Sequence, residues 1–474
     1  MHQAKMIING VPNTSDNVVD VINPATEEVF AQCHFGDRDT VNAAVSSARG
    51  AFPLWSNLSD EKRKAKLLEV ASLLESNMHE LMELVTMESG KPMNGLNGIG
   101  SGMELGGSIA WTQVGASFDL PVEVIQDNEE ARVEVHRKPL GVVASITPWN
   151  WPLMIAIWHV IPALRAGNTV LIKPSPYTPV ATSRFVELAN SVLPAGVLNL
   201  VHGDTEVGTA ISEHRDINKI IFTGSTPTGK KIMELSASSL KRLTLELGGN
   251  DAGIVLPDVQ VSEIADKLFG VAFHNNGQTC AALKRLYVHE SQYDEVCEAL
   301  ASIANSVKVG NGMNPDSDLG PLQNARQLHI VKSLVESARE NRGVILAGGR
   351  ELDGPGYFYA PTIIADQTDG DRVVDEEQFG PILPVIKYSD LDEVIRRANR
   401  NDAGLGGSVW SNDLDRAADV ASRLECGTVW INDHGAVQPD APFGGVKQSG
   451  IGVEFGVQGL KECTSIQTIK IAKL

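Results

Sequence analysis

A cysteine and a glutamate in this chain have the surroundings that nucleophilic catalysis requires. Cys280 follows the turn residues Gly277–Thr279, and the small residues after it leave room for a substrate carbon to approach the sulfur. Glu246 lies in the apolar run Leu245–Gly249, where a carboxylate is costly unless it has a partner or a task. The two side chains are therefore candidates for a nucleophile and a base that share one cleft.

Each residue also has a simpler interpretation. A free cysteine in an apolar context is most often a small core residue, and a glutamate in a strand is as often turned to solvent. A helix following Cys280 would favour catalysis, because its N-terminal dipole lowers the pKa of the thiol. If Glu246 faces the cleft, desolvation raises its pKa and suits it to act as a general base.

Asn150 is the third candidate, within the motif Thr147-Pro148-Trp149-Asn150-Trp151-Pro152. An asparagine in a loop is usually a turn residue, but here prolines and tryptophans fix the backbone around a single amide. Its side-chain NH2 and the backbone N–H of Cys280 would form an oxyanion hole, in which each donor supplies about 3 kcal/mol.

Together these motifs resemble the NAD(P)-dependent aldehyde dehydrogenases, and the similarity runs from Asn23–Thr26 to the C-terminal strand. The resemblance implies that Cys280 adds to the aldehyde to give a thiohemiacetal, and that Glu246 activates the water that hydrolyses the resulting thioester. Because Glu246 is present, release of a carboxylic acid is favoured over transfer of the acyl group to coenzyme A. An inactive structural protein, like certain lens crystallins of the family, is disfavoured because Cys280, Glu246 and Asn150 are all retained.

The segment Gly224–Lys230 matches a phosphate-binding loop up to its last position, where Lys231 replaces the Ser or Thr that would hold Mg²⁺. A kinase or ATPase is therefore disfavoured. The resemblance implies a site for NAD or NADP instead, in which Ser225 bonds a phosphate and a helix N-terminus faces the pyrophosphate. It also implies that Lys173 contacts the adenosine ribose, and that Glu377 and Phe379 hold the nicotinamide ribose and pack beside its ring. The complete predicted cofactor set is Ile146, Thr147, Pro148, Trp149, Lys173, Ser175, Pro176, Gly208, Phe222, Gly224, Ser225, Glu246, Leu247, Gly248, Glu377 and Phe379.

The chain departs from the family pattern at Pro176 and His159. Many NAD-preferring members have Glu at the first position, and loss of that carboxylate removes repulsion toward a 2′-phosphate, so we expect NADP to be tolerated. Many members have Lys at the second position, which helps to connect the base to bulk water. A histidine there predicts a proton route that is sensitive to pH near neutrality.

The predicted walls of the substrate pocket are aromatic, aliphatic or small, and the loop Gly435–Gly445 contains no Lys or Arg. They are Trp111, Trp151, Ile155, Trp158, Thr279, Ala281, Ala436, Val437 and Phe443, of which Trp151, Trp158, Thr279 and Phe443, with Asn150, are predicted to bind substrate. A charged tail would require a cation, so we expect uncharged medium or long aliphatic, or aromatic, aldehydes. Betaine aldehyde is the alternative, since tryptophans can hold a quaternary ammonium group.

Strands and helices alternate from Gly141 onward, which predicts two doubly wound α/β domains. The predicted strands from Gly141 onward include Gly141–Ile146, Thr169–Ile172, Val197–Val201, Lys219–Phe222, Arg242–Leu247 and Ala252–Leu256. The segment before residue 118 is predicted to be mainly helical, with one helix that begins after Ser59 and ends at Gly90–Pro92. We predict a dinucleotide-binding domain over 1–118 and 139–248, a catalytic domain over 249–445, and a small β extension over 119–138 and 446–474. The resemblance implies that this extension adds a strand across the interface of a homodimer or homotetramer.

Composition excludes several classes of function. The chain has 474 residues and a net charge of −19, which argues against binding to nucleic acid or to an anionic membrane surface. Gly141–Leu164 has no charged residue, but its prolines favour a buried helix over a membrane span. The five cysteines form no CxxC pair, and neither they nor the histidines have metal-ligand spacing. We therefore expect a cytoplasmic protein without a metal site.

Overall fold

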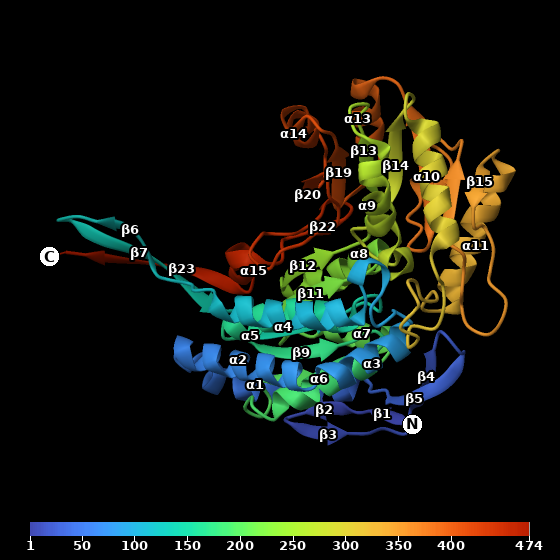
Figure 1. The fold of residues 1–474 in the computed structure, drawn as a ribbon. Helices are drawn as coiled ribbons and strands as arrows, with labels where there is room; N and C mark the ends of the chain where they lie inside the picture. Colours follow the sequence, from blue (N-terminus) through green and yellow to red (C-terminus); the bar gives the residue numbers. More distant parts are fainter. Residues whose placement is uncertain (474) are drawn as a thin grey trace.

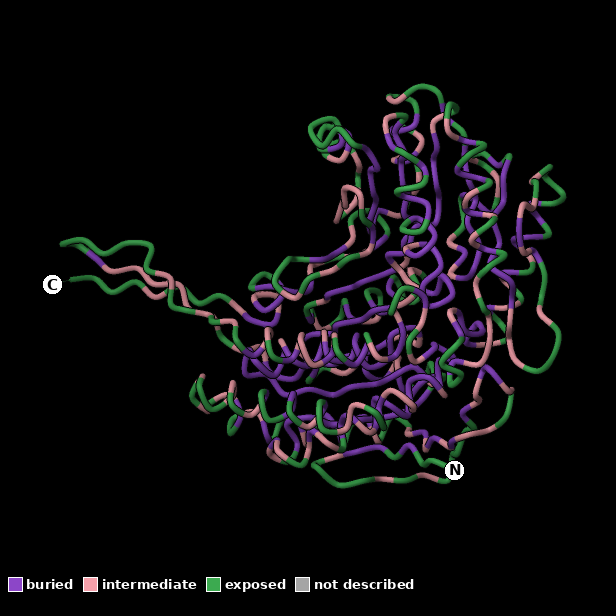
Figure 2. Tube along the Cα trace, in the orientation of Figure 1, coloured by how far each residue is buried: buried purple, intermediate pink, exposed green. Residues whose placement is uncertain are grey.

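Two large, mostly parallel sheets organise the chain, and a narrow arm projects from one side (Figure 1). The computed structural model describes residues 1–473. One large sheet has eight strands and the other has seven, and the arm has three. Figure 2 shows that the strands of the large sheets are buried, whereas the arm is mostly exposed. The predicted fold class, two doubly wound α/β units with a small β extension, is confirmed.

The eight-stranded sheet has a parallel centre with antiparallel edges. Its parallel strands lie in the order β12-β11-β8-β9-β10, with the bounds Arg242–Glu246, Lys219–Thr223, Val142–Ile146, Thr169–Lys173 and Leu198–Leu200. They are apolar runs because both faces of a parallel sheet are covered by helices. Chain order reverses between β8 and β11, and ligands bind at the carboxyl ends of strands at such a reversal. The edge strands are β2 (Met6–Ile8), β3 (Val11–Asn13) and β22 (Gly450–Ile451).

Helices before and between these strands cover the sheet (Figure 1). They are α1 (Arg38–Ser56), α2 (Asp60–Ser76), α3 (Met78–Ser89), α4 (Ser101–Ser117), α5 (Pro152–Arg165), α6 (Val180–Asn190), α7 (Thr205–Glu213) and α8 (Thr226–Ser236), with 3-10 turns η1 (Leu96–Gly98) and η2 (Ala237–Ser239). The Ser59 hydroxyl caps α2 as expected, and Gly90 ends α3 with a left-handed φ of 78°. The predicted single helix is divided at Asn77, whose side-chain Nδ2 donates to the Leu73 carbonyl 2.8 Å away. This bond satisfies a terminal carbonyl of α2 and starts a new helix.

The N-terminal segment differs from the prediction of mainly helical structure. Strands β1 (His2–Ala4), β4 (Val18–Asn23) and β5 (Glu28–His34) form a separate three-stranded sheet, and β2 and β3 extend the large sheet. Several of these strands have only three residues. Such short strands show no readable alternation, and their pairing with distant strands decides their structure.

The seven-stranded sheet is formed by the second half of the chain. Its order is β15-β16-β17-β14-β13-β19-β20, and all neighbours are parallel except β15 and β16. The strands are β13 (Asp251–Val255), β14 (Leu283–His289), β15 (Val344–Ala347), β16 (Thr362–Ala365), β17 (Ile382–Tyr388), β19 (Gly406–Trp410) and β20 (Thr428–Ile431). The helices of this half are α9 (Val261–Phe273), η3 (His274–Gly277), α10 (Tyr293–Ser306), α11 (Ala325–Glu340), α12 (Arg372–Asp375), α13 (Leu391–Asn399) and α14 (Leu414–Ser422), and β18 (Ala403–Gly404) pairs with β21 (Val446–Lys447).

The arm consists of β6 (Glu123–Asp127), β7 (Ala131–Pro139) and β23 (Thr464–Ala472). Strand β23 pairs antiparallel with β7 along its full length, from Thr464 opposite Pro139 to Ala472 opposite Ala131. The short helix α15 (Gly456–Glu462) connects the arm to the body, where it contacts α5. The residues just before α15 belong to the body of the molecule, because their strand β22 pairs with β12 of the eight-stranded sheet.

The apolar stretch that imitates a membrane span forms β8 and the buried helix α5. Among the helices of residues 1–473, none is long and apolar enough to cross a membrane. The five cysteines are all free. Within the same residues, no group of three or more His, Cys, Asp or Glu side chains is arranged to hold a metal ion.

Candidate functional site

A pocket of about 470 Å³ lies at the carboxyl ends of the parallel strands of the eight-stranded sheet. Its walls come from the loops after β8, β9, β11 and β12, from the beginning of α11, and from the segment before β17. Most of the predicted cofactor residues line it, together with two of the three predicted catalytic residues: Thr147, Pro148, Trp149, Asn150, Lys173, Ser175, Pro176, Phe222, Gly224, Ser225, Leu247, Gly248, Cys280, Glu377 and Phe379.

Three predicted cofactor residues do not line this pocket. Gly208 lies within α7, Ile146 is buried at the end of β8, and Glu246 is buried at the end of β12. Their roles toward the cofactor stay predictions. The pocket also includes residues that sequence reasoning missed, namely Tyr177, Thr223, Thr228, Asn324, Arg326, Gln327 and Ile330. Asn324, Arg326, Gln327 and Ile330 lie in the half of the chain that forms the seven-stranded sheet. They reach the pocket only through the tertiary fold, and no local sequence motif reveals this contact.

The N-terminus of α8 faces this pocket and is suited to a phosphate. Ser225 precedes the helix without capping it by a side-chain hydrogen bond, and its hydroxyl lies 2.9 Å from that of Thr228. The first backbone N–H groups of α8 are therefore left for a ligand. At the end of β9, the buried Lys173 ammonium donates only to the Pro174 carbonyl at 3.3 Å, and burial lowers its pKa to about 8.

Glu377 is held at the other side of the pocket. Its Oε1 accepts hydrogen bonds from Lys284 Nζ at 2.8 Å and from the backbone N–H of Gly249 at 3.1 Å. A Cβ atom at Gly248 would lie only 2.3 Å from Glu377 Oε2, so a larger residue there would displace this carboxylate. Trp149 and Phe379 meet edge to face with ring centroids 5.2 Å apart. The pocket thus has an anion-binding helix end on one wall and a fixed carboxylate on another, which fits a dinucleotide.

Cys280 lies at the boundary between this pocket and an aromatic cluster. The residues before it have left-handed backbone, with φ of 51° at Asn275, 57° at Asn276 and 72° at Gly277. A Cβ at Gly277 would lie 2.2 Å from the Gly380 carbonyl oxygen, so only glycine fits this turn. Backbone strain of this kind is tolerated where the surroundings fix it, and it is concentrated at functional sites.

The expectation of a helix after Cys280 is wrong. The chain continues from Cys280 into strand β14, and the preceding helix α9 already ends at Phe273. No helix dipole therefore lowers the thiol pKa; burial instead raises it to about 12, against an opposing effect of Lys284. The Lys284 ammonium donates to the Cys280 carbonyl oxygen at 2.5 Å and is the nearest fixed positive influence on the thiol.

Asn150 is fixed against the cysteine turn. Its Nδ2 donates to the Gln278 carbonyl at 2.9 Å, and Asn275 Nδ2 donates to the Asn150 carbonyl at 3.1 Å. The amide carries a second hydrogen for another acceptor. The backbone N–H of Cys280 donates no hydrogen bond to the described residues 1–473. Both donors of the predicted oxyanion hole are therefore available on the same loop pair.

A buried ion pair that sequence reasoning missed holds the loop that contains Asn150. Lys91 and Glu104 are fully buried and paired, and Glu104 Oε1 also accepts the backbone N–H groups of Leu153 and Met154 at 3.0 and 3.2 Å. The Lys91 ammonium lies 3.3 Å from the centre of the Trp151 ring. These contacts fix the N-terminus of α5, which directly follows Asn150.

Trp151 continues this network to the residue before the cysteine. Its indole Nε1 donates to the Thr279 hydroxyl at 3.1 Å. Trp151 packs with Met154 and Ile155 on one side of α5, and Trp158 packs against the same group. Trp151 therefore serves as a support between α5 and the cysteine turn in addition to its predicted contact with substrate.

Glu246 ends β12 with its side chain 5% exposed. Neither carboxylate oxygen has a hydrogen-bond partner among residues 1–473. Burial, followed by the charge of Glu454, raises the pKa of Glu246 well above its usual range. A Cβ at Gly444 would lie 3.2 Å from Glu246 Oε1, so the glycine leaves space beside the carboxylate. The predicted desolvation of this group is thus present.

His159 is completely buried between polar partners. Its Nδ1 lies 2.9 Å from the Ser145 hydroxyl, and its Nε2 lies 3.0 Å from the Thr223 hydroxyl. Nε2 also approaches Glu454 Oε1 to 3.1 Å, but without the alignment of a hydrogen bond. His159 does not itself reach solvent, so a route to bulk water would have to continue through Glu454.

A cavity of about 10 Å³ lies next to Glu454 and extends toward the surface. It is lined in part by Lys219, Thr244 and Glu462. Lys219 Nζ donates to the Thr244 hydroxyl at 2.6 Å and lies 3.7 Å from Glu462, whose side chain is 40% exposed. Glu454 was missed from the sequence, although it stands alone between apolar residues just as Glu246 does.

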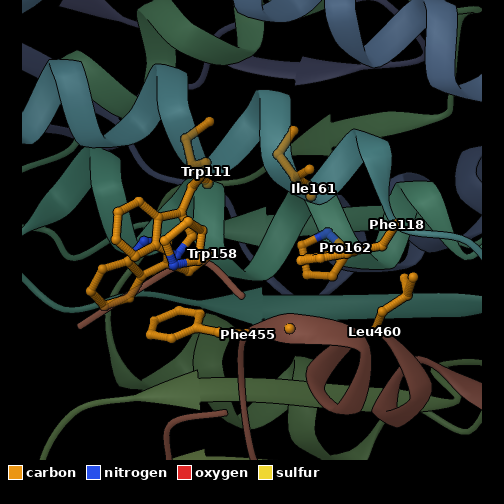
Figure 3. Close-up of a pocket in the computed structure, with 11 residues that line it drawn as sticks. Trp111, Phe118, Trp158, Ile161, Pro162, Phe455 and Leu460 are labelled. Atoms are coloured by element: carbon orange, nitrogen blue, oxygen red, sulfur yellow. The ribbon is translucent and has the colours of Figure 1, made fainter. Parts of the chain in front are cut away.

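Aromatic rings surround the side of Cys280 away from the cofactor pocket. Phe443 and Phe455 form a buried cluster with Ala281 and Leu405, and Cys280, Trp111, Trp158, Trp430 and Val437 pack against it. The Phe455 ring centre lies 4.7 Å from that of Trp158 and 5.6 Å from that of Trp111 (Figure 3). The Phe455 ring also stacks on Phe443, with centroids 5.8 Å apart. Phe455 was not predicted, and its φ of 64° shows that the backbone is constrained to place this ring.

Sequence comparison identifies relatives along the whole chain. A profile described as the aldehyde dehydrogenase family matches residues 11–469. The chain is 39% identical to a phenylacetaldehyde dehydrogenase of Pseudomonas fluorescens, an alignment that covers 99% of this chain and 96% of the relative. It is 36% identical to a betaine aldehyde dehydrogenase of Bacillus subtilis, over 96% of this chain and 94% of the relative.

Comparison with solved structures gives the same result. An NAD⁺ complex of an aldehyde dehydrogenase from Bacillus cereus matches with a TM-score of 0.96 and 35% identity, over 99% of this chain and 97% of that one. A betaine aldehyde dehydrogenase from Staphylococcus aureus in complex with NAD⁺ matches with a TM-score of 0.95 and 33% identity, over 99% of this chain and 95% of that one.

Proposed function

This chain belongs to the aldehyde dehydrogenase family, and on that premise we propose that it oxidises uncharged aldehydes to carboxylic acids at Cys280. It is an oxidoreductase that acts on aldehydes, and its cofactor is NAD or NADP. The observation that carries the finer proposal is the position of Cys280, which lines the dinucleotide pocket and also packs against the aromatic cluster. A carbon bonded to this sulfur would lie between a hydride acceptor and an apolar enclosure.

The Cys280 thiol gives its proton to water, and its sulfur bonds the carbonyl carbon while the π pair of the C=O bond moves onto the oxygen. Negative charge then develops on the aldehyde oxygen, where the Asn150 amide and the backbone N–H of Cys280 supply fixed donors. The turn before Cys280 and the buried pair of Lys91 and Glu104 keep these donors in place. Preorganisation of this kind lowers the cost of forming the oxyanion.

The bound dinucleotide supplies the hydride acceptor for the oxidation. The α8 N-terminus and Ser225 would hold its phosphates, and Lys173 and Glu377 would hold its sugars. These roles are supported by the residues that line the 470 Å³ pocket, and in particular by the N-terminus of α8, which no side chain caps. Pro176 lines the same pocket without a carboxylate, which supports the proposal that NADP is accepted as well as NAD.

Glu246 is proposed to remove a proton from the water that attacks the thioester carbonyl. The C–S bond then breaks, the carboxylic acid leaves, and the Cys280 sulfur is regenerated. A raised pKa makes a carboxylate a stronger base near neutral pH, and the burial of Glu246 beside Glu454 provides this. A member that transferred its acyl group to coenzyme A would not need this base.

The deciding experiment is a panel of aldehydes assayed with NAD and with NADP, with and without coenzyme A, by absorbance of the reduced cofactor. We expect turnover without coenzyme A, and the free acid as product. The Cys280→Ala variant should bind cofactor but show no turnover; turnover at the wild-type rate in this variant would overturn the assignment of the nucleophile.

Betaine aldehyde is the second candidate substrate. It is supported by the tryptophan rings beside Cys280, since aromatic faces attract quaternary ammonium groups, and by the betaine aldehyde dehydrogenases among the relatives. The two candidates are separated by the same panel, in which kcat/KM for betaine aldehyde is compared with that for neutral aryl and alkyl aldehydes.

We also propose that the chain forms a homodimer or homotetramer through its arm. The arm has β23 as an open edge strand, and exposed apolar side chains occur on it and on β6. Unpaired edges with exposed apolar residues are avoided in monomers. The division into a dinucleotide-binding domain, a catalytic domain and this extension is proposed because each large sheet and the arm has its own strands, apart from the short β21 and β22, which pair with strands of the body. The free cysteines agree with a reducing, cytoplasmic location.

A further inference from the structure

A small cavity borders the aromatic cluster and shares no lining residue with the cofactor pocket (Figure 3). Its volume is about 30 Å³, which is roughly the share of one water molecule in the liquid. Trp111 and Trp158 line it, and their rings touch with centroids 5.7 Å apart. Every other residue of its wall is a glycine, proline, phenylalanine, leucine or isoleucine. The indole N–H groups are thus the only polar side-chain groups that these residues possess.

Neither indole N–H is satisfied by the protein. Trp111 Nε1 and Trp158 Nε1 are buried, and neither has an acceptor among residues 1–473. Trp430, which packs against the same cluster, differs because its Nε1 donates to the Ala436 carbonyl at 2.8 Å. A buried donor without a partner costs about 1–3 kcal/mol. A hydrogen-bond acceptor on a ligand that reached these indole N–H groups would therefore gain more binding free energy than at a surface whose donors are already bonded.

The chemistry of the cavity restricts that acceptor. It offers donors but no cation, so a carboxylate or phosphate would be buried without a counter-charge. A quaternary ammonium group has no lone pair with which to accept either hydrogen bond. A neutral oxygen, such as that of an ether or a ketone, matches both the donors and the size of the cavity.

The position of the cavity connects it to the reaction proposed above. Cys280 and Trp158 pack against the same buried residues, so the tail of an aldehyde held at the sulfur would extend along Phe443 and Phe455. Those rings favour an aryl group in the tail. We infer that the cavity is a subsite for a neutral hydrogen-bond acceptor on the substrate tail, and that the preferred substrates are aryl aldehydes with an ether or carbonyl oxygen remote from the formyl group. This inference rests on the proposed oxidation at Cys280.

A matched pair of substrates tests the subsite. 3-(4-Methoxyphenyl)propanal and 3-(4-ethylphenyl)propanal have nearly the same shape, differ by oxygen against CH2 in the tail, and keep the substituent electronically remote from the carbonyl. One net hydrogen bond of about 1 kcal/mol corresponds to roughly a fivefold preference in kcat/KM for the methoxy compound. A wild-type ratio at or below one would overturn the inference, as would a higher kcat/KM for betaine aldehyde than for both neutral aldehydes.

Tryptophan variants locate the effect. Trp111→Phe and Trp158→Phe remove one N–H each while keeping a ring, and we expect each to lower the methoxy-to-ethyl ratio and the double variant to bring it close to one. The Trp430→Phe variant is the matched control, because its indole N–H is already satisfied, and it should retain the wild-type ratio. If the ratio persists in the double variant, the acceptor is recognised elsewhere and the inference fails.

A binding measurement separates this inference from the proposed reaction. The corresponding alcohols, 3-(4-methoxyphenyl)propan-1-ol and 3-(4-ethylphenyl)propan-1-ol, are titrated calorimetrically into the Cys280→Ala variant with cofactor present. The same preference in Kd is expected. If the variant binds the methoxy alcohol more tightly but the wild type turns over no aldehyde, the proposed reaction is wrong and the subsite stands. If the wild type turns over aldehydes but the two alcohols have equal Kd values, the subsite is wrong and the reaction stands.

Discussion

At the level of single residues, Cys280 combines a half-buried, desolvated thiol with one nearby ammonium, that of Lys284. Because its pKa is raised to about 12, the thiolate fraction of the free protein is small at neutral pH and grows about tenfold for each pH unit. We expect the rate of alkylation of Cys280 by iodoacetamide to rise steadily between about pH 7 and 10, as measured by mass spectrometry of the modified peptide. A plateau below pH 9 would contradict the raised pKa.

The Lys284→Met variant is the matched comparison for that experiment. It removes the positive charge that lowers the thiol pKa, so alkylation at any fixed pH should become slower. If the rate is unchanged, the ammonium does not influence the sulfur.

Glu246 and Glu454 give a second prediction about pH. Glu246 acts as a base only when it is deprotonated, so steady turnover should fall as pH drops through its raised pKa. The Glu454→Gln variant removes the negative charge that helps to raise that pKa, and the fall in kcat should move to lower pH. The measurement is kcat against pH for both proteins.

Two results would limit this interpretation. A profile that does not shift in Glu454→Gln would show that desolvation alone sets the pKa of Glu246. The Glu246→Gln variant should keep the initial burst of reduced cofactor and slow the steady rate, and an unchanged steady rate would remove Glu246 from the hydrolytic step.

Pro176 allows a third prediction at this scale. It lines the dinucleotide pocket next to Ser175 and Tyr177. A carboxylate placed there would repel a 2′-phosphate, so Pro176→Glu should raise KM for NADP relative to KM for NAD. Unaltered relative KM values would show that the 2′ position is read by other residues, among which Arg326 lines the same pocket.

At the level of elements, the start of α5 is the best-supported part of the site. Glu104 accepts hydrogen bonds from its N-terminal N–H groups and is paired with Lys91, although the two residues come from α4 and from the segment before η1. Leaving one charge of a buried pair without its partner costs about 3–5 kcal/mol. We therefore expect Glu104→Gln to lower the free energy of unfolding by an amount of this order, and to lower kcat/KM for aldehydes because Asn150 lies just before this helix.

A double-mutant cycle checks that expectation by denaturant unfolding. The variant with Lys91→Met and Glu104→Gln should be more stable than Glu104→Gln alone, because it no longer buries an unpaired ammonium. Additive losses in the cycle would show that the two side chains do not act as a pair.

Local patterns predicted the elements that are long and apolar. The parallel strands β8 to β12 and the cap of α2 by Ser59 lie where the sequence placed them, because burial on both faces and side-chain capping leave direct traces in the residue order. Pairing over long distances leaves no such trace. The N-terminal strands and the contact of Glu454 with His159 were therefore missed. The supposed helix after Cys280 was wrong because only two residues separate Cys280 from β14, which leaves no room for a helix.

At the level of the whole molecule, the arm is the feature that a single chain leaves incomplete. Ile466 and Ile471 on β23 are 60% and 48% exposed, and β23 has one unpaired edge. We expect Ile466→Asp to shift the mass measured by light scattering from the oligomer toward the monomer, because a buried charge is costly in an interface. The Gln467→Asp variant on the same strand is the control, since it changes a side chain that is already polar, and it should leave the mass unchanged. A monomeric wild-type protein would exclude the oligomer.

The arm is joined to the catalytic centre through a short stretch of chain. Glu454 and Phe455, which approach Glu246 and Trp158, immediately precede α15, and α15 leads into β23. By contrast, every residue that lines the dinucleotide pocket comes before residue 380. A ribosome therefore synthesises the complete lining of the dinucleotide pocket well before it adds the ring and the carboxylate that finish the aldehyde side. A nascent polypeptide therefore contains its nucleotide-binding residues, Asn150 and Cys280 before it contains Glu454 and Phe455, so the side chains that border the aldehyde site are completed last.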